Sequence, residues 1–149
     1  DREISYKSII DSIEKDNRLS VTERDSLIHS RIGQGQFRDN ILKKYSSSCI
    51  VTGINLKRVL VASHIKPWSI SDANEKLDIH NGLLMCPNHD KLFDRGYISF
   101  DDTGRILISE KLDDNNRMYM NITPTMKIDI TEENIKYIKY HRKNVFIEK

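Results

Sequence analysis

Two short apolar runs, each next to a residue suited to catalysis, most constrain what this chain can fold into. The first run leads into His64. Asn81 opens the second run, and His89 and Asp90 follow it at the start of a helical segment. This order predicts a strand, a loop, a second strand and a helix, with the polar side chains gathered near their junctions.

Length and composition restrict the class of protein. The chain has 149 residues, a net charge of +2 and 31% charged residues, which predicts one domain with a real core. No apolar run approaches the roughly 20 residues that span a bilayer, and no signal peptide is visible. We therefore expect a cytoplasmic protein with no membrane partner. The first residue is Asp1 rather than Met, so we also expect a fragment of a longer protein.

The N-terminal third has helical patterns. Residues 3–17 carry isoleucines at near-helical spacing, which predicts an amphipathic helix. Ser20 and Glu23 have the spacing of a capping box and predict the start of a second helix. We expect this helix to end in the glycine-containing stretch 33–35, and a separate short helix to cover 37–45.

The remaining segments extend the strand and helix pattern. Residues 69–80 are polar and predict a loop. Residues 97–100 and 105–108 flank an Asp-Asp-Thr-Gly turn, which predicts a hairpin. A C-terminal helix is expected after Thr131, through Tyr140.

Several sequence phrases resemble one nuclease family. They read ASHIKPW at 62–68, NGLL at 81–84, and LFD, G and ISF within 92–100. In these phrases the chain is similar to the HNH endonucleases, with a resemblance from about Arg24 to Phe146. It implies an α+β protein: a ββα-metal core at about 57–96, N-terminal helices, an additional β-hairpin and a C-terminal helix. The HNH domain would then span 20–149, with 1–19 an N-terminal helix or a linker from a preceding domain.

The resemblance also implies an activity. The expected function is metal-dependent hydrolysis of phosphodiester bonds in double-stranded DNA, as the cleavage domain of a restriction or anti-phage defence protein. One Mg²⁺ or Mn²⁺ per active site is the expected cofactor. A recognition domain in the same full-length protein, and a homodimer, are the expected partners.

Family roles pass to individual residues of this chain. His64 corresponds to the general base, because an imidazole can take a proton from water near neutral pH. Asn81 would hold the loop that carries the base. Lys66, Lys91 and Arg95 would contact DNA phosphates.

The third catalytic position has two candidates. His89 matches the second histidine in the His-Asn-His order that names the family, and we keep it as a candidate for both a catalytic residue and a metal ligand. Asp90 lies nine positions after Asn81, which is where several HNH families carry the metal ligand of the helix. Its carboxylate also suits a hard divalent ion, so Asp90 is slightly favoured as the metal ligand. Ser63 stands where many family members have a metal-binding residue, which predicts weak metal binding without DNA.

The cysteines lie where many HNH proteins carry CxxC pairs. Here Thr52 and His89 replace the second cysteine of each pair, so four-thiolate zinc is excluded. Cys49, Cys86 and His89 could hold zinc with a fourth ligand, but we favour two buried, small apolar side chains over a structural zinc.

Two alternatives to an active nuclease stay open from the sequence. One is an HNH-derived module that binds DNA without cutting it. The other is an interaction domain stabilised by zinc on the two cysteines and His89.

Overall fold

The computed structural model describes residues 2–149, with side chains described from residue 7 onward. Asp1, the first residue of the expected N-terminal segment, and the Ile4 side chain of the expected amphipathic helix lie outside this description. The fold mixes helices with short strands, which confirms the α+β class. The elements, in chain order, are α1 (Arg2–Glu14), α2 (Val21–Lys44), β1 (Val61–His64), α3 (Ala73–Leu77), β2 (Gly82–Met85), α4 (Pro87–Asp94), β3 (Ile98–Phe100), β4 (Ile106–Ile108), α5 (Asp114–Tyr119) and α6 (Glu132–Asn144).

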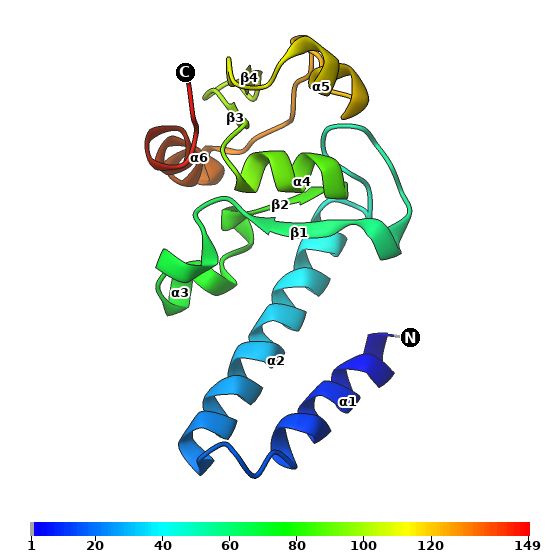
Figure 1. The fold of residues 1–149 in the computed structure, drawn as a ribbon, viewed down its shortest axis with the longest axis vertical. Coiled ribbons are helices and arrows are strands. Elements are labelled where there is room, and N and C mark those ends of the chain that lie inside the picture. The colour runs from blue at the N-terminus through cyan, green and yellow to red at the C-terminus, as the bar shows by residue number, and fades with distance from the viewer. Residues whose placement is uncertain (1) are drawn as a thin grey trace.

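The expected ββα unit is present at the centre of the molecule. β1 and β2 pair antiparallel, with His64 opposite Gly82 and Val61 opposite Met85. α4 lies across this pair of strands (Figure 1). Every residue of β2 is buried, as its continuous apolar sequence requires. The strand pair and α4 therefore form the core that positions the polar side chains around them.

α2 corrects one sequence expectation. The capping box is present, because Ser20 Oγ accepts from the Glu23 amide and Glu23 Oε2 accepts from the Ser20 amide. The helix then continues through Gly33 and Gly35 to Lys44, as one element instead of two. A helix-interior glycine costs only about 1 kcal/mol relative to alanine. The core packing of the buried C-terminal half of α2 outweighs this cost.

The segment expected as a loop contains a helix. Asp72 Oδ1 accepts from the Glu75 amide, and Glu75 Oε1 accepts from the Asp72 amide, which makes a second capping box at the start of α3. Gly33 of α2 lies against this helix, since a Cβ there would be 3.3 Å from Leu77 Cδ2. The sequence contains a signal for α3, an Asp followed three residues later by Glu, but the polar composition of the segment favoured a loop.

The C-terminal part covers the other face of α4. β3 and β4 form the predicted hairpin, with Ile98 opposite Ile108. His141 on α6 is buried, stacks on Phe93 with ring centroids 3.7 Å apart, and bonds the Phe93 carbonyl at 2.8 Å. α6 begins at Glu132, as predicted, and runs four residues past the expected end. α5 was not predicted.

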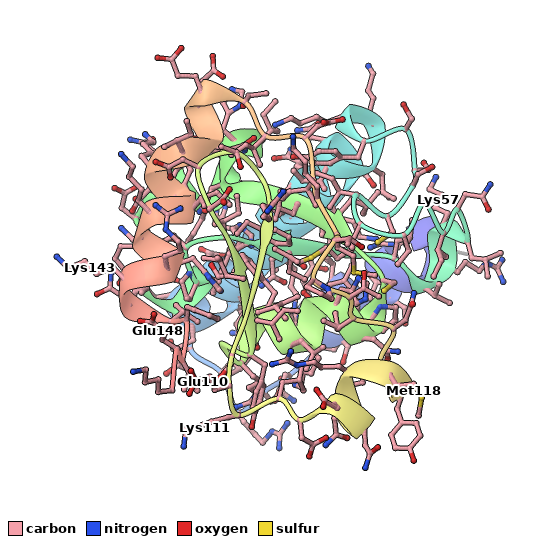
Figure 2. All side chains as sticks on the ribbon, turned by 90° about the horizontal axis from the view of Figure 1, so that it is seen from above. Lys57, Glu110, Lys111, Met118, Lys143 and Glu148 are labelled. Atoms are coloured by element: carbon pink, nitrogen blue, oxygen red, sulfur yellow. The ribbon has the colours of Figure 1, made fainter. Side chains whose placement is uncertain are left out.

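Two further features concern the molecule outside the ββα unit. No helix in residues 2–149 combines the length and the apolar character that a membrane crossing needs. Cationic side chains are spread around the molecule, and Lys57 and Lys143 project on opposite sides (Figure 2).

Candidate active site

His64 lies at the end of β1, where its imidazole is held on three sides. Its ring stacks on Phe37 of α2, with centroids 3.8 Å apart and planes at 14°. Trp68 contacts it edge-on, with centroids 5.5 Å apart. Its Nε2 lies 2.8 Å from the carbonyl oxygen of Lys76. Aromatic packing and one hydrogen bond therefore fix the direction of the ring.

The hydrogen bond also determines which nitrogen of His64 carries the proton. A carbonyl oxygen only accepts, so Nε2 is the protonated nitrogen of the neutral ring and Nδ1 keeps its lone pair. Desolvation lowers the pKa of His64, partly offset by the bond to the Lys76 carbonyl. The neutral form is thus favoured at neutral pH. A cavity of about 280 Å³ adjoins the ring, and its lining includes His64, Trp68, Phe37 and Arg38.

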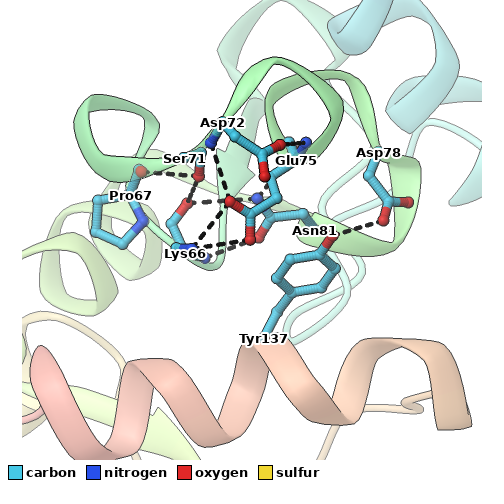
Figure 3. Close-up of polar contacts among 8 residues, drawn as sticks. All are labelled: Lys66, Pro67, Ser71, Asp72, Glu75, Asp78, Asn81 and Tyr137. Carbon is cyan, nitrogen blue, oxygen red and sulfur yellow. Dashed lines mark hydrogen bonds and ion pairs between the residues drawn. The ribbon is translucent and has the colours of Figure 1, made fainter.

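Asn81 clamps the segment between the two strands. Its side chain is fully buried. Oδ1 accepts from the Lys66 amide at 2.8 Å, and Nδ2 donates to the Glu75 carbonyl at 3.0 Å (Figure 3). These bonds join Lys66, two residues after β1, to α3 and to the start of β2. Because Lys76 follows Glu75, the clamp also holds the carbonyl that orients His64.

Lys66 is engaged within the same network. Its Nζ lies 2.9 and 2.8 Å from the two carboxylate oxygens of Glu75, with the two side chains 20% and 22% exposed. The ammonium also lies 5.1 Å from the centroid of the Tyr140 ring. The hydrogen bonds that Lys66 donates to Glu75 raise the pKa of Lys66. Lys66 was expected to meet DNA, and here its charge is already paired inside the protein.

α6 supports this loop from below. Tyr137 Oη donates to Asp78 Oδ2 at 2.6 Å (Figure 3). Asn134 Nδ2 donates to the His80 carbonyl at 2.6 Å. The loop that orients His64 is therefore fixed by two elements, the Asn81 clamp and α6.

Asp90 and Ser63 meet on the α4 side of β1. Ser63 Oγ donates a short hydrogen bond to Asp90 Oδ1. Burial raises the pKa of Asp90, and the bond from Ser63 opposes that rise. Ser63 and His64 are adjacent in β1, so their side chains leave opposite faces of the strand, Ser63 toward α4 and His64 toward α2.

The family comparison covers these residues. Residues 49–101 match the family model described as HNH endonuclease. Over these residues the chain is similar to the HNH endonucleases. The HNH segment includes His64, Asn81 and Asp90, whereas Phe37 and Arg38 come from α2, outside it.

Two further comparisons, with curated proteins and with solved structures, support less than the HNH match does. A search of curated proteins found no match. Among solved structures, a modification dependent TagI restriction endonuclease is similar at 18% sequence identity, with a TM-score of 0.47 over 71% of this chain. The chain spans 36% of the length of that protein.

His89, the other HNH candidate, lies in different surroundings from Asp90. It is buried, and its Nε2 bonds the Asn121 carbonyl at 3.0 Å. Its ring nitrogens and the sulfurs of Cys49 and Cys86 provide a set of ligand atoms within 4.8 Å of one another. The structure thus groups His89 with the cysteines, and Asp90 with Ser63.

The outer face of α4 carries the remaining predicted residues. Lys91 and Arg95 are exposed and lie four residues apart, so they share one side of the helix. Arg38 of α2 donates to the carbonyls of Leu60 and Lys57, the latter at 3.0 Å. Arg38 therefore holds the chain just before β1.

Sequence reasoning missed three contributors to this HNH site. They are the ring of Phe37, the carboxylate of Glu75 and the backbone carbonyl of Lys76. The Asp72–Glu75 capping-box spacing could have found Glu75. No local signal marks a backbone carbonyl or a stacking partner 27 residues away.

Proposed function

We propose that this chain is an HNH nuclease domain that hydrolyses phosphodiester bonds in double-stranded DNA, with His64 as the general base. The observation that carries the proposal is the His64–Lys76 hydrogen bond within an HNH segment. It leaves the base with Nδ1 unprotonated at the end of a rigid strand, beside a cavity. A general base needs this combination of fixed direction and free lone pair.

In the proposed reaction, His64 Nδ1 takes a proton from a water molecule as that water attacks phosphorus. The bond between phosphorus and the 3′ oxygen breaks, the 3′ oxygen takes a proton from solvent, and His64 later releases its own proton to solvent. The lowered pKa of His64 keeps the base neutral before the reaction. The Asn81 clamp keeps its direction constant, and small misplacements of a base cost large factors in rate.

The residues present fit a hard divalent cation. Asp90 offers carboxylate oxygens and Ser63 a hydroxyl oxygen, and oxygen ligands are those that Mg²⁺ and Mn²⁺ prefer. When bound, such an ion would offset charge on the phosphate and stabilise the departing oxygen. We assign Asp90 as the metal ligand in preference to His89. One carboxylate and one hydroxyl are a small ligand set, which supports weak metal binding without DNA.

Lys91 and Arg95 are the side chains we assign to DNA phosphates. Both are exposed, Lys91 on α4, the helix that carries Asp90, and Arg95 at the C-terminal cap of that helix. DNA bound along this face would lie near the Ser63–Asp90 pair. Lys66 is assigned a positioning role instead, because Glu75 already neutralises it.

The wider role follows from family analogy alone. We propose a restriction or anti-phage defence protein of the cytoplasm, in which residues 20–149 cut DNA and 1–19 connect to a recognition domain. Cutting both strands would need a homodimer or two successive nicks.

Cleavage of supercoiled plasmid with Mg²⁺, and then with Mn²⁺, tests the proposal. We expect the wild-type chain to nick or linearise the plasmid, and His64→Ala to lose about 10²–10⁴-fold in rate. His29→Ala is the matched control, because His29 is an exposed histidine on α2. Equal cutting by the wild type and His64→Ala would reject His64 as the base. DNA binding without cutting at any metal concentration would favour the inactive DNA-binding module.

A further inference from the structure

Three buried side chains from two parts of the chain converge beside α4. Cys49 follows α2, whereas Cys86 is the N-cap of α4 and His89 lies in the first turn of that helix. They are 3%, 5% and 1% exposed, and one ligand atom from each lies within 4.8 Å of the other two. Two sulfurs and an imidazole nitrogen are a typical ligand set for zinc.

The sulfur of Cys49 is surrounded by hydrogen-bond donors. The backbone amides of Thr52 and Cys86 donate to Cys49 Sγ at 3.4 and 3.3 Å. A buried sulfur that served only as a small apolar group would not need two amide donors.

His89 supplies an independent observation. Its Nε2 donates to the Asn121 carbonyl at 3.0 Å, so the neutral ring keeps its lone pair on Nδ1. That Nδ1 is buried and has no hydrogen-bond partner within the described residues. Zinc-binding histidines characteristically bond a carbonyl with the ring nitrogen that faces away from the metal. A cation would satisfy the nitrogen that the protein leaves unpaired.

We propose that Cys49 Sγ, Cys86 Sγ and His89 Nδ1 bind one structural zinc ion that ties the segment after α2 to β2 and α4. The two thiol protons leave to solvent when the ion binds. The fourth ligand would be water, because Thr52 stands where a CxxC pair would place another thiolate. This replaces the sequence-based preference for two apolar cysteines, and it does not depend on nuclease activity.

Zinc content and affinity test the proposal on the full 149-residue chain, purified without a polyhistidine tag. We expect about one zinc per wild-type chain by elemental analysis, and a melting temperature that falls on chelation and recovers when Zn²⁺ is restored. Competition with a chromophoric chelator should show affinity at least about tenfold weaker for His89→Gln, whose amide can still bond Asn121. The control His29→Ala should bind as the wild type does.

Two other variants make the result decisive. Cys49→Ala/Cys86→Ala keeps small apolar groups in the core, and should fold but hold no zinc. Thr52→Cys adds a thiolate at the missing position and should bind at least about tenfold more tightly. Equal zinc content in the wild type and the double variant would overturn the proposal. The proposal would also be overturned if the two thiols of the wild type form a disulfide in air and added Zn²⁺ leaves the melting temperature unchanged.

Discussion

The Nε2 atom of His64 lies 2.8 Å from the carbonyl oxygen of Lys76, so the end of β1 is bonded to the end of α3. The protonation state of the imidazole therefore depends on how the segment between the strands is folded. Asn81 holds that segment through its bonds to Lys66 and Glu75. The chemistry assigned to one side chain thus rests on the position of a loop.

The pH dependence of cleavage should report the lowered pKa of His64. A base works when it is neutral, so the rate should be constant at neutral pH and fall as pH falls through that pKa. Because desolvation lowers it, the midpoint should lie below the ordinary histidine value of 6.5. Single-turnover nicking between pH 5 and 8 at saturating Mn²⁺ measures it. A midpoint above 6.5 would contradict the buried, neutral imidazole.

Asn81 substitutions should separate the two halves of its clamp. Asn81→Ala removes the partners of the Lys66 amide and the Glu75 carbonyl, and should lower the free energy of unfolding by about 1–3 kcal/mol for each buried group left unpaired. Asn81→Asp keeps the acceptor for Lys66 and loses the donor to Glu75. It should destabilise at least as much as alanine in urea denaturation at pH 7, because a buried carboxylate oxygen would face the Glu75 carbonyl. We expect cleavage to drop in both variants, and unchanged cleavage in Asn81→Ala would show that the loop is held without it.

Charge removal should distinguish free from paired cations. Lys91→Gln and Arg95→Gln should each weaken binding of duplex DNA and reduce the slope of log affinity against log salt by about 1. Lys66→Gln should change this slope less, because Glu75 already neutralises that ammonium. Fluorescence anisotropy across a salt series, in Ca²⁺ to suppress cutting, makes the comparison. An equal slope change for Lys66→Gln would place Lys66 on the phosphate backbone after all.

The ββα unit was predictable because its signals are local. β2 follows from the apolar run after Asn81, and α4 from the helical segment that contains His89 and Asp90, although this helix begins earlier, at Pro87. The hairpin followed from its turn. In these elements the spacing of apolar residues along the sequence matches the side that is buried.

Other features depend on contacts that sequence does not announce. The glycines at 33 and 35 suggested a break, yet burial of Phe37, Ile41 and Leu42 carries α2 through them. The pairing of Lys66 with Glu75 arises only because the loop folds back on β1. His89 and Asp90 lie in different surroundings because neighbouring helical residues point about 100° apart. The contacts of His89 with the cysteines required the structure.

Asp90→Asn should remove cleavage without destabilising the metal-free protein. Burial raises the pKa of Asp90, so the folded chain binds its proton more tightly than the unfolded chain does. The associated stability is present below the ordinary value of 3.8 and is lost as pH rises through the raised pKa. At pH 7 the buried carboxylate is thus a cost, and asparagine can keep the Ser63 bond without the charge. We expect Asp90→Asn to unfold at equal or higher urea concentration than the wild type at pH 7, and to lose cleavage with Mg²⁺ and Mn²⁺. Lower stability at pH 7 would mean that the carboxylate is a structural group instead of a metal ligand kept at the expense of stability.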